Sequence, residues 1–496
     1  MKIAFSISGL NTEVKTLVSI GLQIKSSVAF EKWYKLLASI YNIKMKFKKN
    51  LLNLFFFTCL LAIGVNISIL LAAQVGSTNS NNFIWTSETS DPNLLGWMEG
   101  SPPPQDKIIS FNDGSYFQFP QMRWSVCNFQ QLMPTKSVGR GLSFSVPLKK
   151  EKLAEIDRLT FIPINGSEPM TWQHSLEANF TDGIVVLHHG KIVYEKFFGC
   201  LTPTNRHAAM SMTKSFVGLL GEMLVAENKL DEDRQIQDYI PELSQSAFGD
   251  ATVRQVMDMT TSLEYSEDYN DPNAGVWEHA AAGNPLPKPE NYTGPRTYFE
   301  FLETVQKEGE HGSSFSYKTI NTDVLGWLIS RVTGQPITEV LSKKIWSKIG
   351  AEQDAFFNVD SIGTPFAGGG LNAGLRDMAR FGQMILDGGR VGQKQIVSEA
   401  VIRNIRRGGD REAFADAGYS LLEGWSYRSM WWITHNEHGA FMARGVHGQS
   451  LYIDPQADMV IARFASHPMA KNAAIDPTTL PAYQVLANYL LQIDNS

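Results

Sequence analysis

The sequence predicts an α+β fold in which segments from both ends of the chain contribute strands to one antiparallel sheet. Two β-rich runs flank a glycine turn within residues 183–198, as expected for a hairpin. Three more β-rich runs, at residues 430–434, 450–454 and 459–465, lie near the C-terminus. We therefore expect a sheet flanked by helices, with a helical subdomain inserted at about residues 230–390.

The expected helices are runs in which apolar residues recur at helical spacing, and glycines follow several of them. They comprise residues 251–259, 298–308, 322–333, 337–349, 375–386 and 481–493. Residues 262–295 are instead rich in Tyr, Asn, Pro and Gly, which predicts a long loop. A loop of this length inside a domain usually serves function.

The N-terminal part of the chain has the pattern of a targeting segment. A basic start, Met-Lys-Phe-Lys-Lys, opens at Met45 and precedes a mostly apolar run at residues 51–73. This order is typical of an export signal, and the run is also long enough to remain as a membrane anchor. We expect residues 45–74 to be a signal peptide or anchor and the protein to be periplasmic or extracellular, with membrane contact only through this segment. Residues 1–44 are interpreted as an over-extended, poorly ordered start.

The rest of the chain is acidic. Residues 1–73 hold nine lysines and two glutamates, which leaves 35 basic and 48 acidic residues for the remainder. Nucleic-acid binding needs a basic face, so this balance argues against it. Residues 75–104 are rich in Ser, Asn, Thr and Pro, which predicts a linker or surface arm before one globular domain at residues 105–496.

Cysteines and histidines give little sign of a metal centre. Cys127 and Cys200 lie outside the export segment, and they could form a disulfide or remain two separate buried thiols. The histidine pairs at 188–189 and at 435 and 438 have no third ligand near them in the sequence. We therefore expect no metal and no cofactor.

The strongest chemical signal is a serine and a lysine three positions apart. Ser211 and Lys214 stand at the start of a helix and share one of its faces. Residues 216–224 are mostly apolar, so the helix should be buried, and a buried lysine is costly unless it is paired or partly neutral. A neutral amine beside a hydroxyl is a base beside a nucleophile.

Two further elements could complete such a site. Tyr317 stands just before a predicted helix, and a phenol held near ammonium groups can give or take a proton. Gly445 and Gly448 enter a predicted strand, where glycines permit a close approach of backbone to ligand. A strand edge that offers N–H groups beside the serine would make an oxyanion hole. His447, between these glycines, is interpreted as a structural histidine or a substrate contact rather than a base.

In this order the three elements resemble the serine β-lactamase and penicillin-recognising superfamily. Within it, the chain most closely resembles the 6-aminohexanoate-dimer hydrolases. The matching strings are residues 210–215, 265–272, 317–325, 376–380, 431–432, 436–437 and 447–449. The resemblance implies a β-lactamase-like fold and a serine hydrolase that cleaves a linear amide or ester bond of a small molecule.

The resemblance also implies the catalytic roles. Ser211 would be the nucleophile that forms an acyl-enzyme. Lys214 would take the serine proton, and Tyr317 would relay a proton to the leaving amine.

The same resemblance implies the surrounding contacts. The backbone N–H groups of Ser211 and Val446 would form the oxyanion hole. Tyr269, His447 and Asn321 would bind substrate, with Tyr269 carried by the long loop and moving on binding. The resemblance implies no metal in this site.

Departures from the superfamily pattern bear on the alternatives. Thr319 stands where β-lactamases usually have asparagine, and Ala443-Arg444-Gly445 replaces the usual Lys-Thr-Gly triplet. Both missing groups help to hold a β-lactam, which disfavours the alternative of a β-lactamase or DD-peptidase. A non-catalytic binding module of the same fold is a further alternative, but it would not need the serine, lysine and tyrosine that are all present here. The sequence does not indicate the natural substrate or the oligomeric state.

Overall fold

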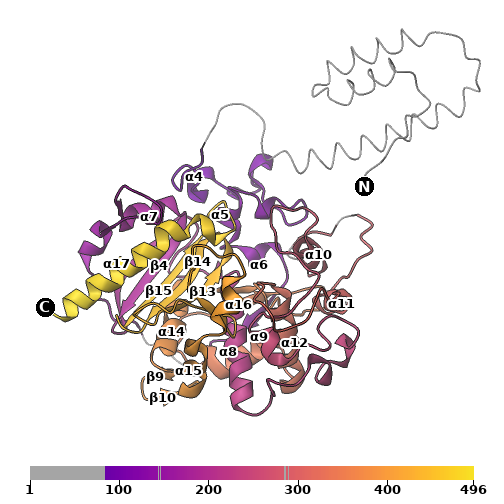
Figure 1. The fold of residues 1–496 in the computed structure, drawn as a ribbon. Coiled ribbons are helices and arrows are strands. Elements are labelled where there is room, and N and C mark those ends of the chain that lie inside the picture. The colour runs from indigo at the N-terminus through magenta and orange to yellow at the C-terminus, as the bar shows by residue number, and fades with distance from the viewer. Residues whose placement is uncertain (1–83, 143–144, 146, 284–285, 289) are drawn as a thin grey trace, which may run out of the picture. The chain divides into compact units, whose positions relative to one another are not determined.

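The computed structural model of the chain describes residues 84–142, 145, 147–283, 286–288 and 290–496 (Figure 1). The expectations for residues 1–44 and for the export segment at 45–74 lie outside these residues. Within the described ranges, no helix has the length and apolar character needed to cross a bilayer.

A seven-stranded antiparallel sheet forms the centre of the fold, in the order β11-β12-β13-β14-β15-β4-β5. Its strands are β4 (Thr181–His188), β5 (Lys191–Phe197), β11 (Ser426–Arg428), β12 (Trp431–Ile433), β13 (Phe441–Gly445), β14 (Gln449–Asp454) and β15 (Met459–Ala465). The predicted hairpin is β4–β5, and β15 pairs with β4, so the C-terminal strands join the N-terminal hairpin. The predicted fold class is therefore confirmed.

Helices cover both faces of this sheet, as Figure 1 shows for α17 across the front. Leu451 of β14 points towards Gly382 of α14 (Leu375–Leu386), while its neighbour Ser450 hydrogen-bonds to Tyr483 of α17 (Asp476–Asp494). Successive side chains on a strand face opposite ways, so α14 and α17 lie on opposite faces. All eight residues of β4 are buried in consequence.

The insertion between β5 and β11 is largely helical. Besides α14, its α-helices are α8 (Met212–Ala226), α9 (Val253–Met257), α10 (Gly275–Ala282), α11 (Tyr298–Thr304), α12 (Ile320–Thr333), α13 (Ile337–Leu341), α15 (Glu399–Arg407) and α16 (Arg411–Ala415). A π turn at Ser342–Trp346 continues α13. The expected helices at 322–333 and 375–386 are confirmed, and Gly334 ends α12 in the left-handed conformation with φ 67°.

Smaller elements complete the domain. A four-stranded sheet has the order β1-β7-β8-β6, formed by β1 (Thr135–Val138), β6 (His207–Ala208), β7 (Ala355–Asn358) and β8 (Leu371–Ala373). Two-stranded pairs are β2–β3 (Thr160–Phe161 and Met170–Thr171) and β9–β10 (Arg390–Val391 and Lys394–Gln395). Short helices are α4 (Pro92–Leu95), α5 (Met122–Ser125), α6 (Phe129–Leu132), α7 (Trp172–Ala178) and single 3₁₀ turns at 105–107, 115–117, 154–158, 236–238, 241–243, 446–448 and 472–474.

Two expectations about element boundaries are wrong. The predicted loop at 262–295 contains helix α10, whose Val276 and Ala282 are buried. The C-terminal helix begins at Asp476 and runs through Pro481. A proline lacks the N–H that would bond the carbonyl four residues earlier, but the Pro477 carbonyl instead accepts a hydrogen bond from the Ile164 N–H at 2.9 Å.

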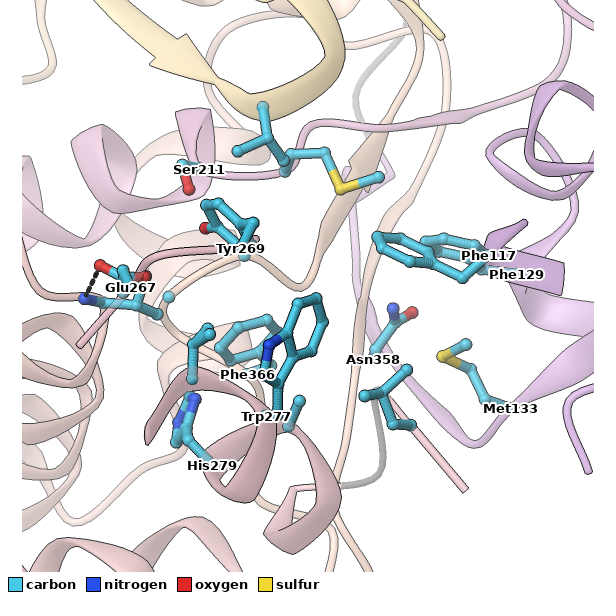
Figure 2. A pocket seen from close by; sticks show the side chains of 18 of the residues that line it. Phe117, Phe129, Met133, Ser211, Glu267, Tyr269, Trp277, His279, Asn358 and Phe366 are labelled. Carbon is cyan, nitrogen blue, oxygen red and sulfur yellow. Dashed lines mark hydrogen bonds between the residues drawn. The ribbon is translucent and has the colours of Figure 1, made fainter. Parts of the chain in front are cut away.

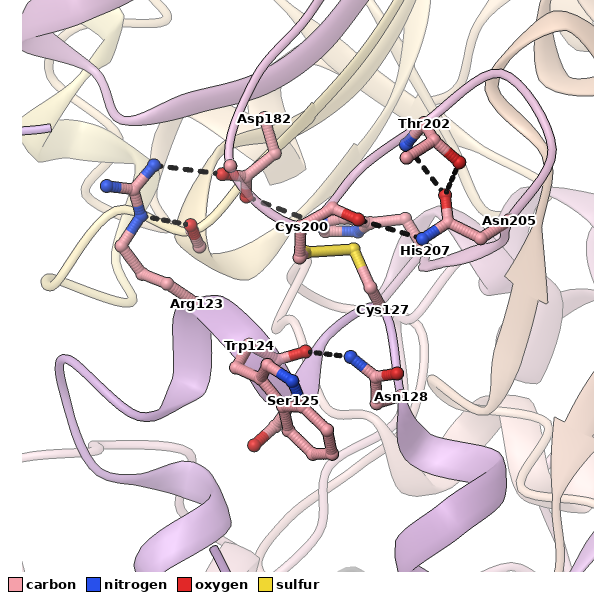
Figure 3. Close-up of a disulfide and its surroundings, with 12 residues drawn as sticks. Arg123, Trp124, Ser125, Cys127, Asn128, Asp182, Cys200, Thr202, Asn205 and His207 are labelled. Atoms are coloured by element: carbon pink, nitrogen blue, oxygen red, sulfur yellow. Dashed lines mark hydrogen bonds and ion pairs between the residues drawn. A yellow bond between two sulfur atoms is a disulfide. The ribbon is translucent and has the colours of Figure 1, made fainter. Parts of the chain in front are cut away.

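A disulfide joins the N-terminal part of the domain to the loop after β5 (Figure 3). Cys127 and Cys200 are bonded, which resolves the alternatives that their spacing left open. Beside the disulfide, Asp182 forms an ion pair with Arg123 at 3.1 Å and accepts a hydrogen bond from His207 at 3.2 Å. All three side chains are buried. Burial alone would raise the pKa of Asp182, but the bond from His207 and the Arg123 charge lower it. This network anchors β6, which leads directly to Ser211.

Candidate active site

A tight bend presents Ser211 at the start of helix α8. Met210 adopts a left-handed conformation with φ 47°, a strained geometry for a side chain of this size. The Thr213 hydroxyl stabilises the bend, since it donates to the Met210 carbonyl at 2.6 Å and accepts from the Leu371 N–H at 3.1 Å. Ser211 occupies the N-cap position of α8, where helix N–H groups favour negative charge.

Lys214 lies one turn further along α8 and is buried, as predicted, with 1% of its surface exposed. Its Nζ donates to Ser211 Oγ at 2.8 Å and to the Gly368 carbonyl at 2.6 Å. Burial lowers the pKa of Lys214 to about 8, although the charges of Glu267 and Asp323 oppose this change. A sizeable fraction of the amine is therefore neutral near pH 8, in contact with the serine hydroxyl.

Tyr317 lies on the other side of this pair. The Lys214 Nζ is 5.1 Å from the centre of its ring, which also packs against Trp432 at 5.5 Å between ring centres. Burial and the Glu267 charge raise the pKa of Tyr317 well above 10, although a hydrogen bond with Ser211 opposes the rise. The phenol therefore carries its proton at neutral pH and can donate it. The structure thus brings the three predicted catalytic side chains together.

The end of strand β13 passes directly against the backbone of Ser211. A Cβ placed on Gly445 would lie 2.8 Å from the Ala209 carbonyl oxygen and 3.0 Å from the Ser211 nitrogen, so only glycine fits here. Val446 follows and begins a 3₁₀ turn, where the first N–H groups have no partner within the turn. The segment carrying the Val446 N–H is therefore beside the Ser211 N–H, as an oxyanion hole requires.

Two cavities meet at Ser211. The smaller, of about 130 Å³, is lined mainly by aromatic and apolar side chains, and Figure 2 shows Ser211 at its edge. These include Phe117, Phe129, Met133, Trp277 and Phe366. The larger cavity, of about 720 Å³, carries the charged side chains Asp268, Asp416, Arg444, Lys471 and Asp476. Both are lined by Ser211, Glu267, Tyr269 and Val446.

Tyr269, predicted to bind substrate, lines both cavities beside Ser211. Its ring packs edge-on against Trp277 at 6.0 Å between centres, where both cavities open. Asp268, next to it, forms an ion pair with Lys471 at 3.0 Å. That pair links the Tyr269 segment to the segment before α17.

His447 and Asn321, which the resemblance predicts to bind substrate, line neither of these cavities. His447 has φ 62° and is turned into the protein, with its Nδ1 2.7 Å from the His467 carbonyl oxygen. Burial lowers the pKa of His447 to about 4, so the ring is neutral. The Asn321 amide accepts from the Thr261 hydroxyl at 2.7 Å and donates to the Lys318 carbonyl at 3.1 Å. The His447 ring also packs against Phe117, which lines the smaller cavity.

Two carboxylates that sequence reasoning did not single out lie close to Lys214. Glu267 accepts from the Thr319 N–H at 2.8 Å and also from the Thr319 hydroxyl, so the unusual threonine holds this acid in place. Asp323 accepts from the Gly368 N–H at 3.0 Å and pairs with His279 at 2.9 Å.

The Gly368 peptide thus connects Asp323 to Lys214, because its carbonyl accepts from the lysine. Glu267 stands two residues before Tyr269, within residues 265–272, one of the strings that resemble the 6-aminohexanoate-dimer hydrolases. Asp323 has no signal in the sequence beyond its place in the matching string at residues 317–325.

Comparison with known proteins agrees with this geometry. A sequence profile described as beta-lactamase matches residues 177–480, more than half of the chain. The chain belongs to the beta-lactamase family. The 6-aminohexanoate-dimer hydrolase of Paenarthrobacter ureafaciens is 34% identical over 384 residues, which are 77% of this chain and 93% of that protein.

A solved structure from Bacillus anthracis, provisionally named 6-aminohexanoate-dimer hydrolase, is also similar. It is 33% identical with a TM-score of 0.72, and the match covers 79% of this chain and 99% of that one. The predicted family and fold are therefore confirmed. The protein is a serine hydrolase that acts on amide or ester bonds.

Proposed function

We propose that Ser211, Lys214 and Tyr317 cleave a linear amide or ester bond through an acyl-enzyme. The observation that carries this proposal is the 2.8 Å contact between Ser211 Oγ and a buried lysine amine, placed where two cavities meet. A nucleophile beside a base, with access for substrate on both sides, is the arrangement that acyl transfer requires.

Acylation begins with the neutral form of Lys214. The amine takes the Ser211 proton as Oγ attacks the substrate carbonyl, and the oxygen that becomes negative accepts hydrogen bonds from the Ser211 and Val446 N–H groups. Tyr317 donates its phenolic proton to the leaving amine or alkoxide as the carbon–nitrogen or carbon–oxygen bond breaks. The lysine ammonium then restores the Tyr317 proton, so acylation consumes no net proton.

Deacylation uses water as the nucleophile and Lys214 again as the base. A water proton passes to the free amine of Lys214 as the water oxygen attacks the ester carbonyl of the acyl-enzyme. Ser211 Oγ leaves and recovers its proton from the same lysine. The acid product and the free enzyme remain.

The two cavities suggest the substrate class. The smaller one is comparable in volume with an engineered cavity of about 150 Å³ that admits benzene, so it suits a short alkyl or aromatic group on one side of the scissile bond. The larger, charged cavity suits a longer polar group on the other side. A linear amide of the 6-aminohexanoate-dimer type, for which the similar hydrolases are named, has short methylene chains and polar ends that match this division.

A β-lactam substrate is disfavoured by the surroundings of Arg444. Arg444 is the middle residue of Ala443-Arg444-Gly445, which replaces the usual Lys-Thr-Gly triplet. Its guanidinium pairs with Asp476 and lies over Trp432 at 5.1 Å. It is therefore already engaged by the protein.

We also propose that the protein is exported. The basic and apolar order of residues 45–74 supports this, and the Cys127–Cys200 disulfide fits an oxidising compartment. Cell fractionation with N-terminal sequencing of the mature chain tests it. Cytosolic protein with an intact N-terminus would contradict export.

A substrate panel tests the proposed chemistry. It comprises p-nitrophenyl esters of two to eight acyl carbons, linear amides including the 6-aminohexanoate dimer, and nitrocefin, each with Ser211→Ala as control. We expect turnover of linear esters and amides with a chain-length optimum, little turnover of nitrocefin, and no turnover by the variant. Turnover of nitrocefin alone would overturn the assignment in favour of a β-lactamase.

A further inference from the structure

A cluster of two imidazoles and two carboxylates lies at one end of the large sheet, and its members line neither cavity at Ser211. His188 ends strand β4 and His189 stands in the turn to β5. Asp458 stands in the turn before β15, and Asp494 is the last residue of α17. The sequence shows the adjacent histidines but no third ligand, because Asp494 is 305 positions from His189.

All four ring nitrogens of the two histidines face oxygen atoms. For His188, Nδ1 is 2.9 Å from the Ala457 carbonyl oxygen and Nε2 is 3.2 Å from Asp494 Oδ1. For His189, Nδ1 is 2.7 Å from Asp458 Oδ2 and Nε2 is 3.0 Å from the same Asp494 oxygen. Carbonyl and ionised carboxylate oxygens only accept hydrogen bonds, so a neutral ring, which has one N–H, can donate to only one of its two oxygen neighbours.

The other contact of a neutral ring is therefore unfavourable, because two lone pairs face each other there. In a neutral ring protonated at Nδ1, the Nε2 lone pair faces Asp494 Oδ1, which also offers only lone pairs. A second proton on each ring would relieve this, but it would put two positive rings beside each other at 4.0 Å between centres.

We propose that His188 Nε2, His189 Nε2 and Asp494 Oδ1 bind a divalent transition metal ion, with Zn²⁺ the best match. His188, His189 and Asp494 each offer a ligand atom, and these atoms lie within 4.8 Å of one another. Tetrahedral Zn²⁺ with bonds of about 2.0–2.2 Å separates its ligand atoms by about 3.3 Å, close to the 3.0 and 3.2 Å observed to Asp494. A cation converts the opposed lone pairs into ligands.

The outer contacts of the cluster fit this assignment. A metal-bound histidine normally donates its other N–H to a carbonyl or carboxylate, as His188 does to Ala457 and His189 does to Asp458. The His189 and Asp494 side chains are 49% and 33% exposed, so water can reach the ion and complete its coordination. The metal would fasten the last helix, α17, to the β4–β5 hairpin and would have a structural role.

Isothermal titration of the chelator-treated, tag-free protein with ZnCl₂ at pH 7.5 tests the proposal. His189→Gln and Asp494→Asn remove one ligand each at exposed positions, and His174→Gln, an exposed histidine on α7, is the matched control. We expect one saturable site in the wild type and the control, and affinity at least about tenfold weaker in the two ligand variants. Added Zn²⁺ should raise Tm only in the first two proteins.

Two outcomes would overturn the proposal. Absence of saturable Zn²⁺ binding by the wild type would mean that hydrogen bonds alone hold the cluster together. Wild-type affinity in both ligand variants would place the ion elsewhere. In support, affinity should fall between pH 7.5 and pH 5.5, because the imidazoles must lose protons to bind the metal.

Discussion

Lys214 should set the pH dependence of turnover, because the proposed acylation needs its amine in the neutral form. Burial lowers the pKa of Lys214 from 10.5 to about 8, which corresponds to about 3 kcal/mol against the charged form. About one tenth of the amine is then neutral at pH 7, and about nine tenths at pH 9. We expect kcat/KM to rise roughly tenfold across this interval and then to level off.

Replacing a carboxylate near Lys214 should shift this pH dependence. Glu267 raises the pKa of Lys214 through its charge, so Glu267→Gln should lower that pKa further and move the whole profile to lower pH. The amide has nearly the same shape and can still accept from the Thr319 N–H. Glu310→Gln is a matched control, because the Glu310 side chain is 93% exposed and should leave the profile unmoved.

Initial rates with p-nitrophenyl acetate, corrected for spontaneous hydrolysis, give kcat/KM from pH 6 to pH 10 for the three proteins. Circular dichroism confirms that each is folded over this range. A wild-type profile that is flat between pH 7 and pH 9 would refute the neutral-amine mechanism. So would a Glu267→Gln profile displaced towards higher pH.

Tyr317→Phe should lower kcat for an amide by about 100-fold or more and for the matching ester by less. An alkoxide leaving group needs less help from an acid than an amine does. Equal losses of kcat in paired assays of the amide and the ester would contradict proton donation by Tyr317. Gly445→Ala places a methyl group 2.8 Å from the Ala209 carbonyl oxygen. We therefore expect kcat to fall by about 100-fold with little change in KM. A wild-type kcat in this variant would argue against the oxyanion hole. Replacing Cys127 and Cys200 by Ser should lower the free energy of unfolding by about 4 kcal/mol in urea titrations, since the bond closes a loop of 73 residues; an unchanged midpoint would contradict this.

Local patterns were sufficient to predict much of the fold. The glycine turn of the β4–β5 hairpin and the amphipathic run of α14 are decided by neighbouring residues, and both match the structure. Strands β11 and β13 were missed because each is short and carries an arginine. Arg444 is buried in β13 only because Asp476, far along the chain, supplies its partner.

In the candidate site, too, some contacts depend on residues close in sequence and others on residues far apart in sequence. Ser211 and Lys214 lie on one helix turn, so spacing alone brings them together, and their contact was predictable. The family resemblance predicts that His447 contacts substrate, but its left-handed backbone turns the ring towards the His467 carbonyl oxygen. Asp323 influences Lys214 through the Gly368 peptide, a connection that exists only after folding.

Covalent labelling tests most directly whether Ser211 is the nucleophile. The protein is treated with a fluorophosphonate, digested and mapped by mass spectrometry, with Ser211→Ala treated in parallel. The account predicts one phosphonylated site at Ser211, labelling that tracks the loss of esterase activity, and neither label nor activity in the folded variant. Stoichiometric label on a different serine, or full activity in Ser211→Ala, would contradict it.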